Sequence, residues 1–188
     1  MINRDIKWTA LFSHTGREIY NISKQLGRFP DKVITNNPPG QPGLCEKIKK
    51  RELLHVSNRP SADEYMSFLD NEHIITLHGW MRIVPEIICE NFDIVNLHPG
   101  LITKYPELKG KDPQKRVAEE ETKTYSKIGC VIHKVTPTVD DGEVILERST
   151  RNPNTGEKAV VDTLYEMASG MWVDFFDLYS KGTLDEIL

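Results

Sequence analysis

The sequence has few cysteines and no long apolar run. Its three cysteines, Cys45, Cys89 and Cys130, lie far apart, are odd in number and form no Cys-x-x-Cys pair. This spacing argues against a disulfide framework and a structural zinc site, and we expect no bound metal. No stretch approaches the roughly 18 consecutive apolar residues of a membrane span. Both absences indicate a globular protein of a reducing compartment, and we expect it in the cytoplasm.

A strong excess of one charge is also absent. The 188 residues include 24 Lys and Arg against 28 Asp and Glu, which gives a net charge of −4, and there is no basic run. This balance argues against broad nucleic-acid or membrane-surface binding and leaves room only for a small basic site. The charged residues within 1–7 predict that no signal peptide is present.

What the sequence does contain is an alternation of apolar runs and helix-like stretches. The length suits one domain over residues 1–188. The apolar runs predict strands at residues 8–12, 32–35, 53–56, 74–77 and 94–97. Helical spacing predicts a helix through Ile19, Ile22 and Leu26, and others at 44–50, 61–69 with Ser61 as N-cap, 114–121 and 158–179.

The end of the chain departs from this alternation. Residues 129–135 and 143–148 are predicted strands joined by a turn-rich link at 136–142. The pattern therefore predicts an α/β fold: an open, Rossmann-like, mostly parallel twisted sheet with helices on both faces and an antiparallel C-terminal addition. In such sheets ligands bind beyond the carboxyl ends of the strands. The loops after Phe12, Leu77 and Leu97 are therefore the candidate ligand-binding loops.

Two polar residues end the most apolar strand. Residues 96–100 read NLHPG, and strand alternation places the side chains of Asn96 and His98 on one face. An amide and an imidazole so placed suit a carbonyl carbon that becomes tetrahedral. The amide donates to the oxyanion, and the imidazole moves a proton or, when charged, stabilises that oxyanion. The alternative is structural, with a buried Asn and a core His that tie down a turn.

An acidic element follows later, where residues 139–142 read VDDG. Two adjacent carboxylates before a glycine most often simply form a turn. If this loop folds over the end of the strand at 94–97, Asp140 is placed to orient His98 or to relay a proton to it. Spacing alone leaves both interpretations open.

Four motifs in order resemble one family. They are GWMRI at 79–83, NLHPGL at 96–101, YP at 105–106 and VDDG at 139–142. Together they resemble the catalytic domain of the 10-formyltetrahydrofolate-dependent formyltransferases, over about residues 9–148. The chain is most similar to the form with a catalytic domain only, such as glycinamide ribonucleotide transformylase.

The resemblance implies transfer of a formyl group from 10-formyltetrahydrofolate, the co-substrate, to an amine. The family's catalytic Asn, His and Asp match Asn96, His98 and Asp140. By this analogy Asn96 and His98 hold the oxyanion, and Asp140 assists proton transfer from the amine. Asp141 stands where the family commonly has a small residue, and we assign it no role.

A folate site is also implied by the resemblance. The family binds the pterin ring in an apolar crevice, largely through backbone groups, which suits a flat ring with several donors and acceptors. For Met81 and Ile83 taken alone, core packing is the simpler interpretation. The matching positions are Met81, Arg82, Ile83 and Val84 on one side, and Val139 and Asp140 opposite.

The first loop differs from that of the transformylase, which cradles its substrate's phosphate with a glycine-rich loop. Here residues 13–18 read SHTGRE, so one glycine survives and no GxGxxG dinucleotide pattern is present. Arg17 can pair with a phosphate, whereas Glu18 would repel one. The alternative is a plain turn and helix cap. The substrate-binding residues implied for this loop are Ser13, Thr15, Gly16 and Arg17.

The acceptor side differs elsewhere as well. Ala168 stands where the transformylase has an acidic residue for its substrate's ribose. The basic segment 109–113 either shapes the acceptor pocket or forms a solvated loop. A tRNA acceptor would favour a basic face, and we expect neither tRNA nor a further domain.

We therefore predict a small-molecule amine as the acceptor. Glycinamide ribonucleotide is one candidate, and an amino sugar or a modified nucleotide is the alternative. The protein is expected to act as a monomer or a homodimer. Two other functions stay open: a catalytically silent folate- or nucleotide-binding module, and a hydrolase on the same fold in which water replaces the amine.

Overall fold

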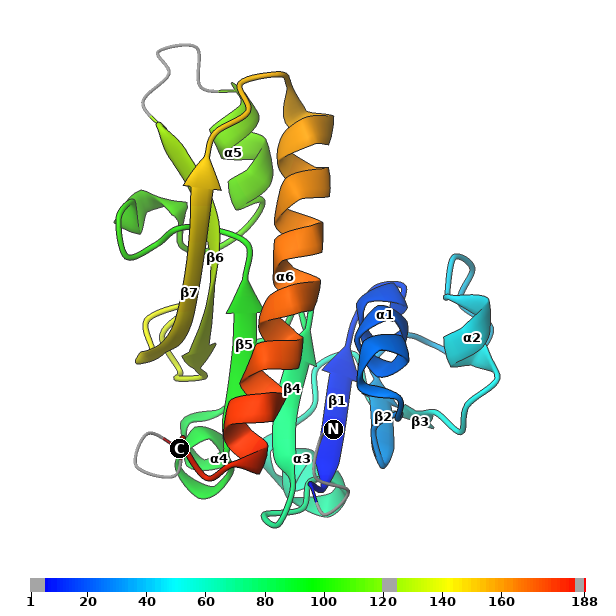
Figure 1. Cartoon of the computed structure of the whole chain (residues 1–188). Coiled ribbons are helices and arrows are strands. Elements are labelled where there is room, and N and C mark those ends of the chain that lie inside the picture. The colour runs from blue at the N-terminus through cyan, green and yellow to red at the C-terminus, as the bar shows by residue number, and fades with distance from the viewer. Residues whose placement is uncertain (1–5, 120–124, 185–187) are drawn as a thin grey trace.

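A seven-stranded sheet forms the centre of the computed structural model, which describes residues 6–119, 125–184 and 188 (Figure 1). The strand order is β3-β2-β1-β4-β5-β6-β7. Strands β1 to β5 pair in parallel, whereas β6 and β7 are antiparallel. This topology confirms the predicted α/β class and its antiparallel addition. The strands are β1 (Trp8–Phe12), β2 (Lys32–Thr35), β3 (Leu54–His55), β4 (Ile74–His78), β5 (Ile94–His98), β6 (Lys127–Lys134) and β7 (Val144–Arg151).

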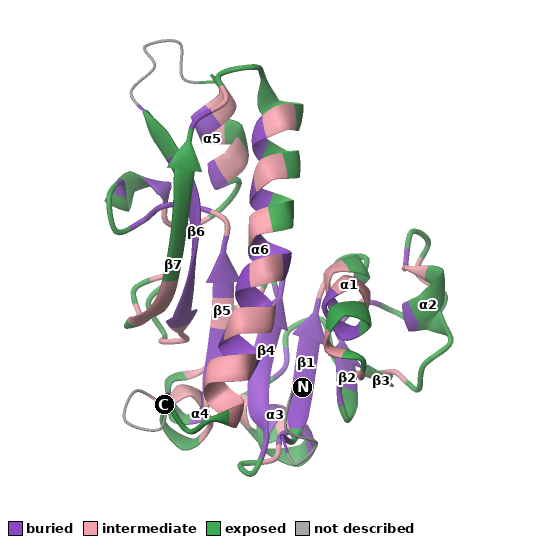
Figure 2. Cartoon of the chain, in the orientation of Figure 1, coloured by how far each residue is buried: buried purple, intermediate pink, exposed green. Residues whose placement is uncertain are grey.

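The central strands are apolar on both faces because helices cover both. On β1, Trp8 and Phe12 join one apolar cluster with α1 (Arg17–Leu26) and α6 (Glu157–Ser180). Leu11 joins a second cluster with α3 (Ala62–Phe68) and α4 (Glu86–Asn91). Figure 2 shows β1 and β4 wholly buried and β7 largely exposed. The helices are α1 (Arg17–Leu26), α2 (Glu46–Lys49), α3 (Ala62–Phe68), α4 (Glu86–Asn91), α5 (Pro113–Glu119) and α6 (Glu157–Ser180), with a 3-10 helix at Pro106–Leu108.

The long helix α6 runs along one face of the sheet (Figure 1). Its residue Phe176 packs on Trp8 of β1, with ring centroids 4.6 Å apart. Within β5, every residue is buried except Asn96, which is partly exposed. Asn96 is therefore the one residue of β5 whose polar side chain solvent can reach.

Most predicted elements are present, with differences at their ends. The strands at 8–12 and 32–35 are confirmed to the residue, and Ser61 caps α3 by accepting the Glu64 N–H at 3.2 Å. The predicted helix 44–50 shortens to α2, and the strand 53–56 shortens to β3, which pairs only with Ile34 and Thr35. Of the predicted helix 114–121, the part at residues 120 and 121 lies outside the described residues.

Two elements were not predicted. Helix α4 has six residues and the 3-10 helix has three. Segments this short contain too few turns for an apolar period to be recognised.

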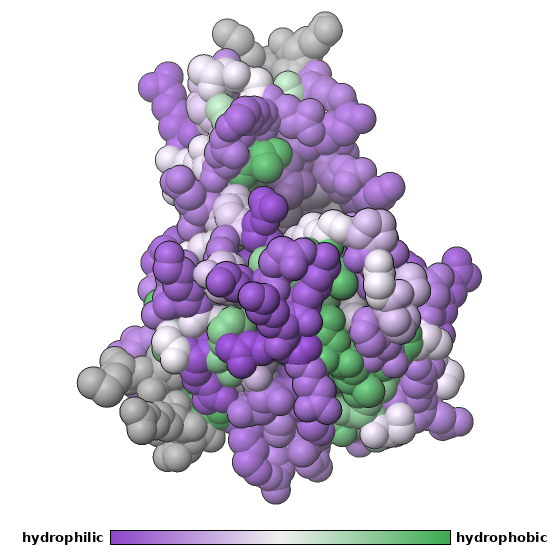
Figure 3. Space-filling view, turned by 90° about the vertical axis from the view of Figure 1, so that its right-hand side faces the viewer, coloured by the Kyte–Doolittle hydropathy of each residue, from purple (hydrophilic) through white to green (hydrophobic). Residues whose placement is uncertain are grey.

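The molecular surface is mainly polar. The face that carries α1, α2 and β3 is largely hydrophilic, with apolar side chains gathered in a restricted patch (Figure 3). In the described part of the chain, no helix combines the length and the apolar character needed to cross a bilayer.

Candidate active site

A cavity of about 630 Å³ lies at the carboxyl ends of β4 and β5. Its walls come from the loops that follow these two strands, from the loop at residues 110–114, and from the segment between β6 and β7. His14, just after β1, also lines it. The cavity is thus where ligands bind in open α/β sheets.

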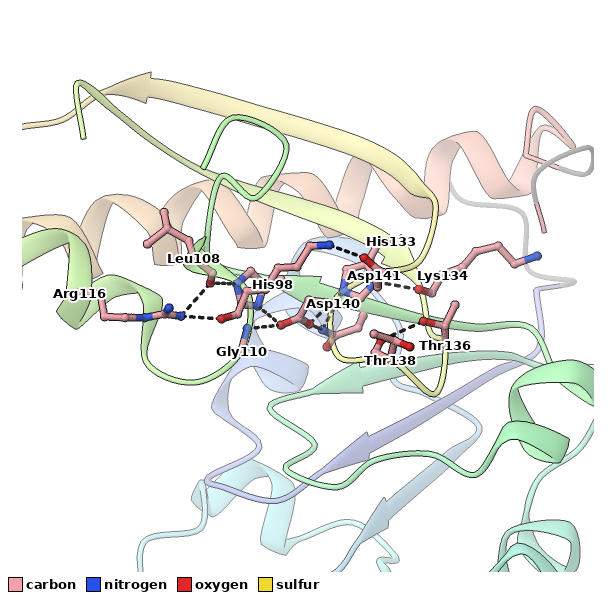
Figure 4. Close-up of polar contacts among 12 residues, drawn as sticks. His98, Leu108, Gly110, Arg116, His133, Lys134, Thr136, Thr138, Asp140 and Asp141 are labelled. Carbon is pink, nitrogen blue, oxygen red and sulfur yellow. Dashed lines mark hydrogen bonds and ion pairs between the residues drawn. The ribbon is translucent and has the colours of Figure 1, made fainter. Parts of the chain in front are cut away.

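Asn96, His98 and Asp140 meet in this cavity. The first two belong to β5. The loop between β6 and β7 brings Asp140 against His98 (Figure 4). His98 Nδ1 lies 3.1 Å from Asp140 Oδ2, and Asn96 Nδ2 lies 3.5 Å from Asp140 Oδ1. The loop therefore folds over the end of the strand, which is the condition under which Asp140 can orient His98.

The imidazole of His98 is held at both ring nitrogens. Its Nε2 lies 2.9 Å from the carbonyl oxygen of Leu108, which can only accept, so Nε2 carries a proton. Its Nδ1 faces the Asp140 carboxylate, and the ring is almost completely buried. Both contacts are satisfied as donations when the ring is an imidazolium paired with Asp140.

Asp140 is placed by an unusual backbone and by several donors. Its φ is 51°, in the left-handed region that non-glycine residues seldom adopt. Oδ2 also accepts the backbone N–H of Gly110 at 2.8 Å. Burial by itself raises the pKa of this carboxyl. Hydrogen bonds from His133, His98 and Gly110 and the charge of His98 outweigh burial and hold its pKa well below the ordinary value.

The turn that carries Asp140 requires glycine at position 142. A Cβ on Gly142 would lie 1.8 Å from the carbonyl oxygen of Lys134, so no side chain fits there. That closeness lets the chain reverse direction between β6 and β7. The VDDG segment is thus both a turn and the source of the site's carboxylate.

His133 belongs to this cluster and was not predicted. It lies on β6 directly opposite Asn96, with Nε2 3.2 Å from Asn96 Nδ2 and 3.3 Å from Asp140 Oδ1. Its Nδ1 lies 2.7 Å from the carbonyl oxygen of Lys134. The register between β5 and β6 creates this contact. The sequence offers only a histidine within a predicted strand as a signal.

Part of the cavity wall is apolar. Met81, Ile83 and Val84 line it after β4, and Val139 lines it from the loop before Asp140. Ile83 is 67% exposed and Val139 is 49% exposed, so these large apolar side chains are not core residues. Arg82 also lines the cavity, and its guanidinium donates to the carbonyl oxygen of Asn58 at 2.5 Å. Core packing, the simpler interpretation, therefore does not describe Met81 and Ile83.

The sequence of residues 31–164 matches the family described as formyl transferase, and this match covers more than half of the chain. The chain belongs to the formyl transferase family.

Individual relatives agree with this assignment. A phosphoribosylglycinamide formyltransferase of Dictyostelium discoideum is 38% identical over 82 residues, which are 40% of this chain and 39% of that protein. The chain thus matches about two fifths of that curated relative.

Two solved structures show the same fold. The phosphoribosylglycinamide formyltransferase of Anaplasma phagocytophilum superposes with a TM-score of 0.78 at 20% identity, over 95% of this chain and 88% of that one. A formyltetrahydrofolate deformylase of Pseudomonas syringae superposes with a TM-score of 0.72 at 15% identity, over 95% and 62%.

The first loop lies beside the cavity, and only part of it faces the cavity. His14 is among the lining residues, whereas Ser13, Thr15, Gly16 and Arg17 are not. The Ser13 hydroxyl accepts the backbone N–H of Met81 at 3.0 Å, and the Thr15 hydroxyl accepts that of Arg17 at 3.2 Å. Gly16 is left-handed, with φ 67°. These contacts tie the loop to the cavity wall, and a role in binding substrate stays a prediction.

Three further residues discussed from the sequence are not among those that line the cavity. Asp141 pairs with Lys109, and Ala168 is buried. Glu18 turns inward, with its Oε2 2.9 Å from Nδ1 of the buried His78. Among the described residues, no group of three or more His, Cys, Asp or Glu side chains is arranged to hold a metal ion.

Proposed function

We propose that this protein transfers a formyl group from 10-formyltetrahydrofolate to a primary amine of a small molecule. The observation that carries the proposal is the convergence of Asn96, His98 and Asp140 at one wall of the cavity. An amide donor, an imidazole and a carboxylate at one point are the groups that acyl transfer through a tetrahedral intermediate needs.

The proposed reaction begins when the amine nitrogen attacks the formyl carbon. A carbon–nitrogen bond forms, and the formyl oxygen becomes an oxyanion. Asn96 Nδ2 donates to this oxyanion. Because Nε2 of His98 stays on the Leu108 carbonyl, the imidazole reaches this oxyanion only through Nδ1–H, the donor that faces Asp140 before the substrate binds.

Asp140 removes the proton that the attacking amine must lose. The carboxyl of Asp140 is ionised at neutral pH, so it can accept this proton directly or through a water. Its depressed pKa means that it does not retain the proton, which passes on to the leaving folate nitrogen. The bond between the formyl carbon and the folate nitrogen then breaks, and that nitrogen takes up a proton. The products are a formamide and tetrahydrofolate, so every atom is accounted for.

The apolar part of the cavity wall is suited to the folate. Met81, Ile83, Val84 and Val139 all line the cavity, and they provide apolar contacts for a flat pterin ring. A volume of about 630 Å³ lies within the roughly 300–1,000 Å³ of small-molecule sites. The backbone groups of residues 81–84 and 139–140 are the proposed partners of the ring's donors and acceptors.

The acceptor is proposed to bind beside the polar lining residues, which include His14, Lys111 and Gln114. Glycinamide ribonucleotide is one candidate acceptor, because two of the similar proteins are named for formylating it. Arg17, with the rest of the first loop, is the proposed partner of its phosphate. Since Glu18 is turned toward His78, its carboxylate does not need to face that phosphate.

An amino sugar or a modified nucleotide is the alternative acceptor. The first loop has one glycine, and buried Ala168 provides no carboxylate for a ribose. Both features distinguish this chain from the transformylase pattern and favour testing other amines.

The deciding experiment measures tetrahydrofolate release from 10-formyltetrahydrofolate with and without glycinamide ribonucleotide. Release that needs this nucleotide identifies it as the acceptor, and release with another amine identifies the alternative. Steady release without any amine would indicate a hydrolase, in keeping with the fold shared with a deformylase. Folate binding without formyl loss for every amine would indicate a silent binding module.

Variants of the three residues test the mechanism. His98→Ala, Asn96→Ala and Asp140→Ala are each expected to lower kcat by about 100-fold or more, because each removes a group that acts in the transition state. Lys115→Ala, on an exposed face of α5, is the matched control and is expected to keep wild-type kcat. Near-wild-type rates for both the Asn96 and the His98 variants would contradict the proposal.

A further inference from the structure

Arg116 is a charged residue beside the site that the proposed reaction does not use. It lies on α5, and its guanidinium turns back onto the preceding loop (Figure 4). Its Nη2 donates to the carbonyl oxygens of Leu108 at 2.9 Å and Lys109 at 2.8 Å, and its Nη1 donates to that of Glu107. One planar side chain therefore holds three successive carbonyls of one segment.

The segment held by Arg116 is the one that contacts the reacting residues. The Leu108 oxygen that accepts from Arg116 also accepts from His98 Nε2, at 2.9 Å. Two residues further on, the Gly110 N–H donates to Asp140 Oδ2 at 2.8 Å. One carbonyl and one amide of the same loop thus contact both members of the His98–Asp140 pair.

Among the described residues, the guanidinium of Arg116 has no hydrogen-bond partner besides these three carbonyls. Its Nε is buried and lacks a hydrogen-bond partner among the residues that the structure describes. Over the same residues it takes part in no ion pair with a carboxylate. A buried N–H without a partner costs free energy. The hydrogen bonds to the three loop carbonyls must offset this cost, so they are what keeps the guanidinium in this position.

We infer that Arg116 is a positioning residue for His98. It fixes the carbonyls of residues 107–109, so that the Leu108 oxygen retains the imidazole and the Gly110 N–H retains Asp140 beside it. The inference rests on the proposed formyl transfer, because the placement of this pair matters for rate only if His98 and Asp140 act on substrate.

The first measurement compares steady-state kinetics of the full chain and its variants. In Arg116→Ala the loop loses its donor, and kcat is expected to fall by about 10- to 100-fold through misplacement of His98. KM for the folate is expected to stay within about twofold of the wild-type value. The reason is that the partners of Arg116 are the carbonyls of residues 107–109 and not the apolar residues that line the cavity. Addition of guanidinium ion at low concentration is expected to restore part of the lost kcat.

Two further variants refine this comparison. Arg116→Lys keeps the charge but lacks a planar fork that can reach three carbonyls, so an intermediate kcat is expected. Lys115→Ala is the matched control, since Lys115 is the adjacent cation on α5. Its side chain is 55% exposed, and its Nζ lies 3.6 Å from Glu119 Oε1. Its kcat is expected to equal that of the wild type.

A second measurement follows the contact itself. In protein labelled with ¹⁵N-histidine, the Nε2–H proton of His98 gives a hydrogen-bonded signal, assigned by its loss in His98→Ala. Arg116→Ala is expected to shift or broaden this signal, while Lys115→Ala leaves it in place. Thermal unfolding shows which variants are folded. If Arg116→Ala does not fold, Arg116→Lys is measured in its place, with the same expected shift.

The outcomes separate this inference from the proposed function. A displaced His98 signal together with reduced kcat supports positioning. An unchanged signal in folded Arg116→Ala overturns it, whether or not kcat falls, and so does an unchanged kcat. If the wild type transfers formyl to no amine, the proposed function fails, and the His98 signal alone decides whether Arg116 places the imidazole.

Discussion

At the residue scale, the side chain of His98 is held on three sides. Its two ring nitrogens are held by the Leu108 carbonyl and the Asp140 carboxylate, which come from different loops. Gly100 leaves room for the ring on a third side. Small changes at any of these positions are therefore expected to move the imidazole and to alter the rate more than the stability.

Gly100→Ala tests this constraint. A Cβ at position 100 would lie 2.7 Å from His98 Nε2 and 2.9 Å from its Cδ2, so the ring has to move. A displacement on the order of 1 Å is expected to lower kcat of formyl transfer by about 100-fold, with little change in the unfolding temperature.

Gly170→Ala, in α6, is the matched control. Its Cβ would meet only the flexible end of Arg148, and wild-type kcat is expected. A Gly100→Ala enzyme with wild-type kcat would show that the imidazole position is not critical.

The depressed pKa of Asp140 predicts how its contribution to stability depends on pH. A carboxyl whose pKa is lowered in the folded protein stabilises it above the unfolded pKa, and this stabilisation is lost as pH falls toward the folded value. Asp140→Asn is therefore expected to lower the free energy of unfolding by about 2 kcal/mol near pH 6. The difference should shrink as the pH falls below about 4.

Urea unfolding over a series of pH values measures this difference. Asp141→Asn serves as control, because Asp141 is 55% exposed and its pairing with Lys109 is expected to contribute less than about 1 kcal/mol. A difference between wild type and Asp140→Asn that stays constant from pH 6 down to pH 3 would contradict the prediction.

At the element scale, strands β5, β6 and β7 assemble the site. The antiparallel register places His133 opposite Asn96, and the tight turn at Gly142 returns Asp140 to the same point. Helix α5 adds the loop contacts through Arg116. The side chains of the site come from β5, from β6 and from the loop after β6, which explains why the cluster depends on the correct pairing of these strands.

Ser61→Ala tests a predicted element boundary. Ser61 accepts the Glu64 N–H at 3.2 Å at the start of α3, and loss of such a cap costs about 1 kcal/mol of stability. Urea unfolding measures this loss, and kcat is expected to be unchanged.

Ser67→Ala, on an exposed position of the same helix, is the control and is expected to be neutral or slightly stabilising. An equal loss in both variants would show that the cap contributes nothing specific.

The prediction of elements from sequence succeeded where the pattern is simple for the element type. The strand at 8–12 is a short apolar run, and it is buried throughout. The prediction failed for α4 and for the 3-10 helix at Pro106–Leu108, because a helix of six or three residues has too few turns to show an apolar period. Leu108, whose carbonyl holds His98, lies in one of these unpredicted segments, so that part of the site was not foreseen.

At the scale of the whole molecule, α6 joins the two halves of the sheet. Its buried aromatic side chains lie in the same apolar cluster as β1 and β5. Phe176→Ala removes a side chain that is 1% exposed and packs on Trp8, and about 3–5 kcal/mol of unfolding free energy is expected to be lost.

Chemical denaturation measures this loss. Tyr165→Ala is the control, since Tyr165 is an aromatic residue of the same helix that is 37% exposed, and a loss of about 1 kcal/mol is expected. Equal losses in the two variants would contradict the central role of this packing.

The amino-acid sequence by itself determined the α/β class and placed Asn96 and His98 on one face. Both follow from local rules, since apolar periodicity selects the element type and strand alternation has a period of two. The tertiary structure alone decided that Asp140 reaches His98, that His133 joins them and that Arg116 holds the Leu108 carbonyl. These contacts depend on strand register and on the path of long loops, which arise from packing between distant segments rather than from any local pattern.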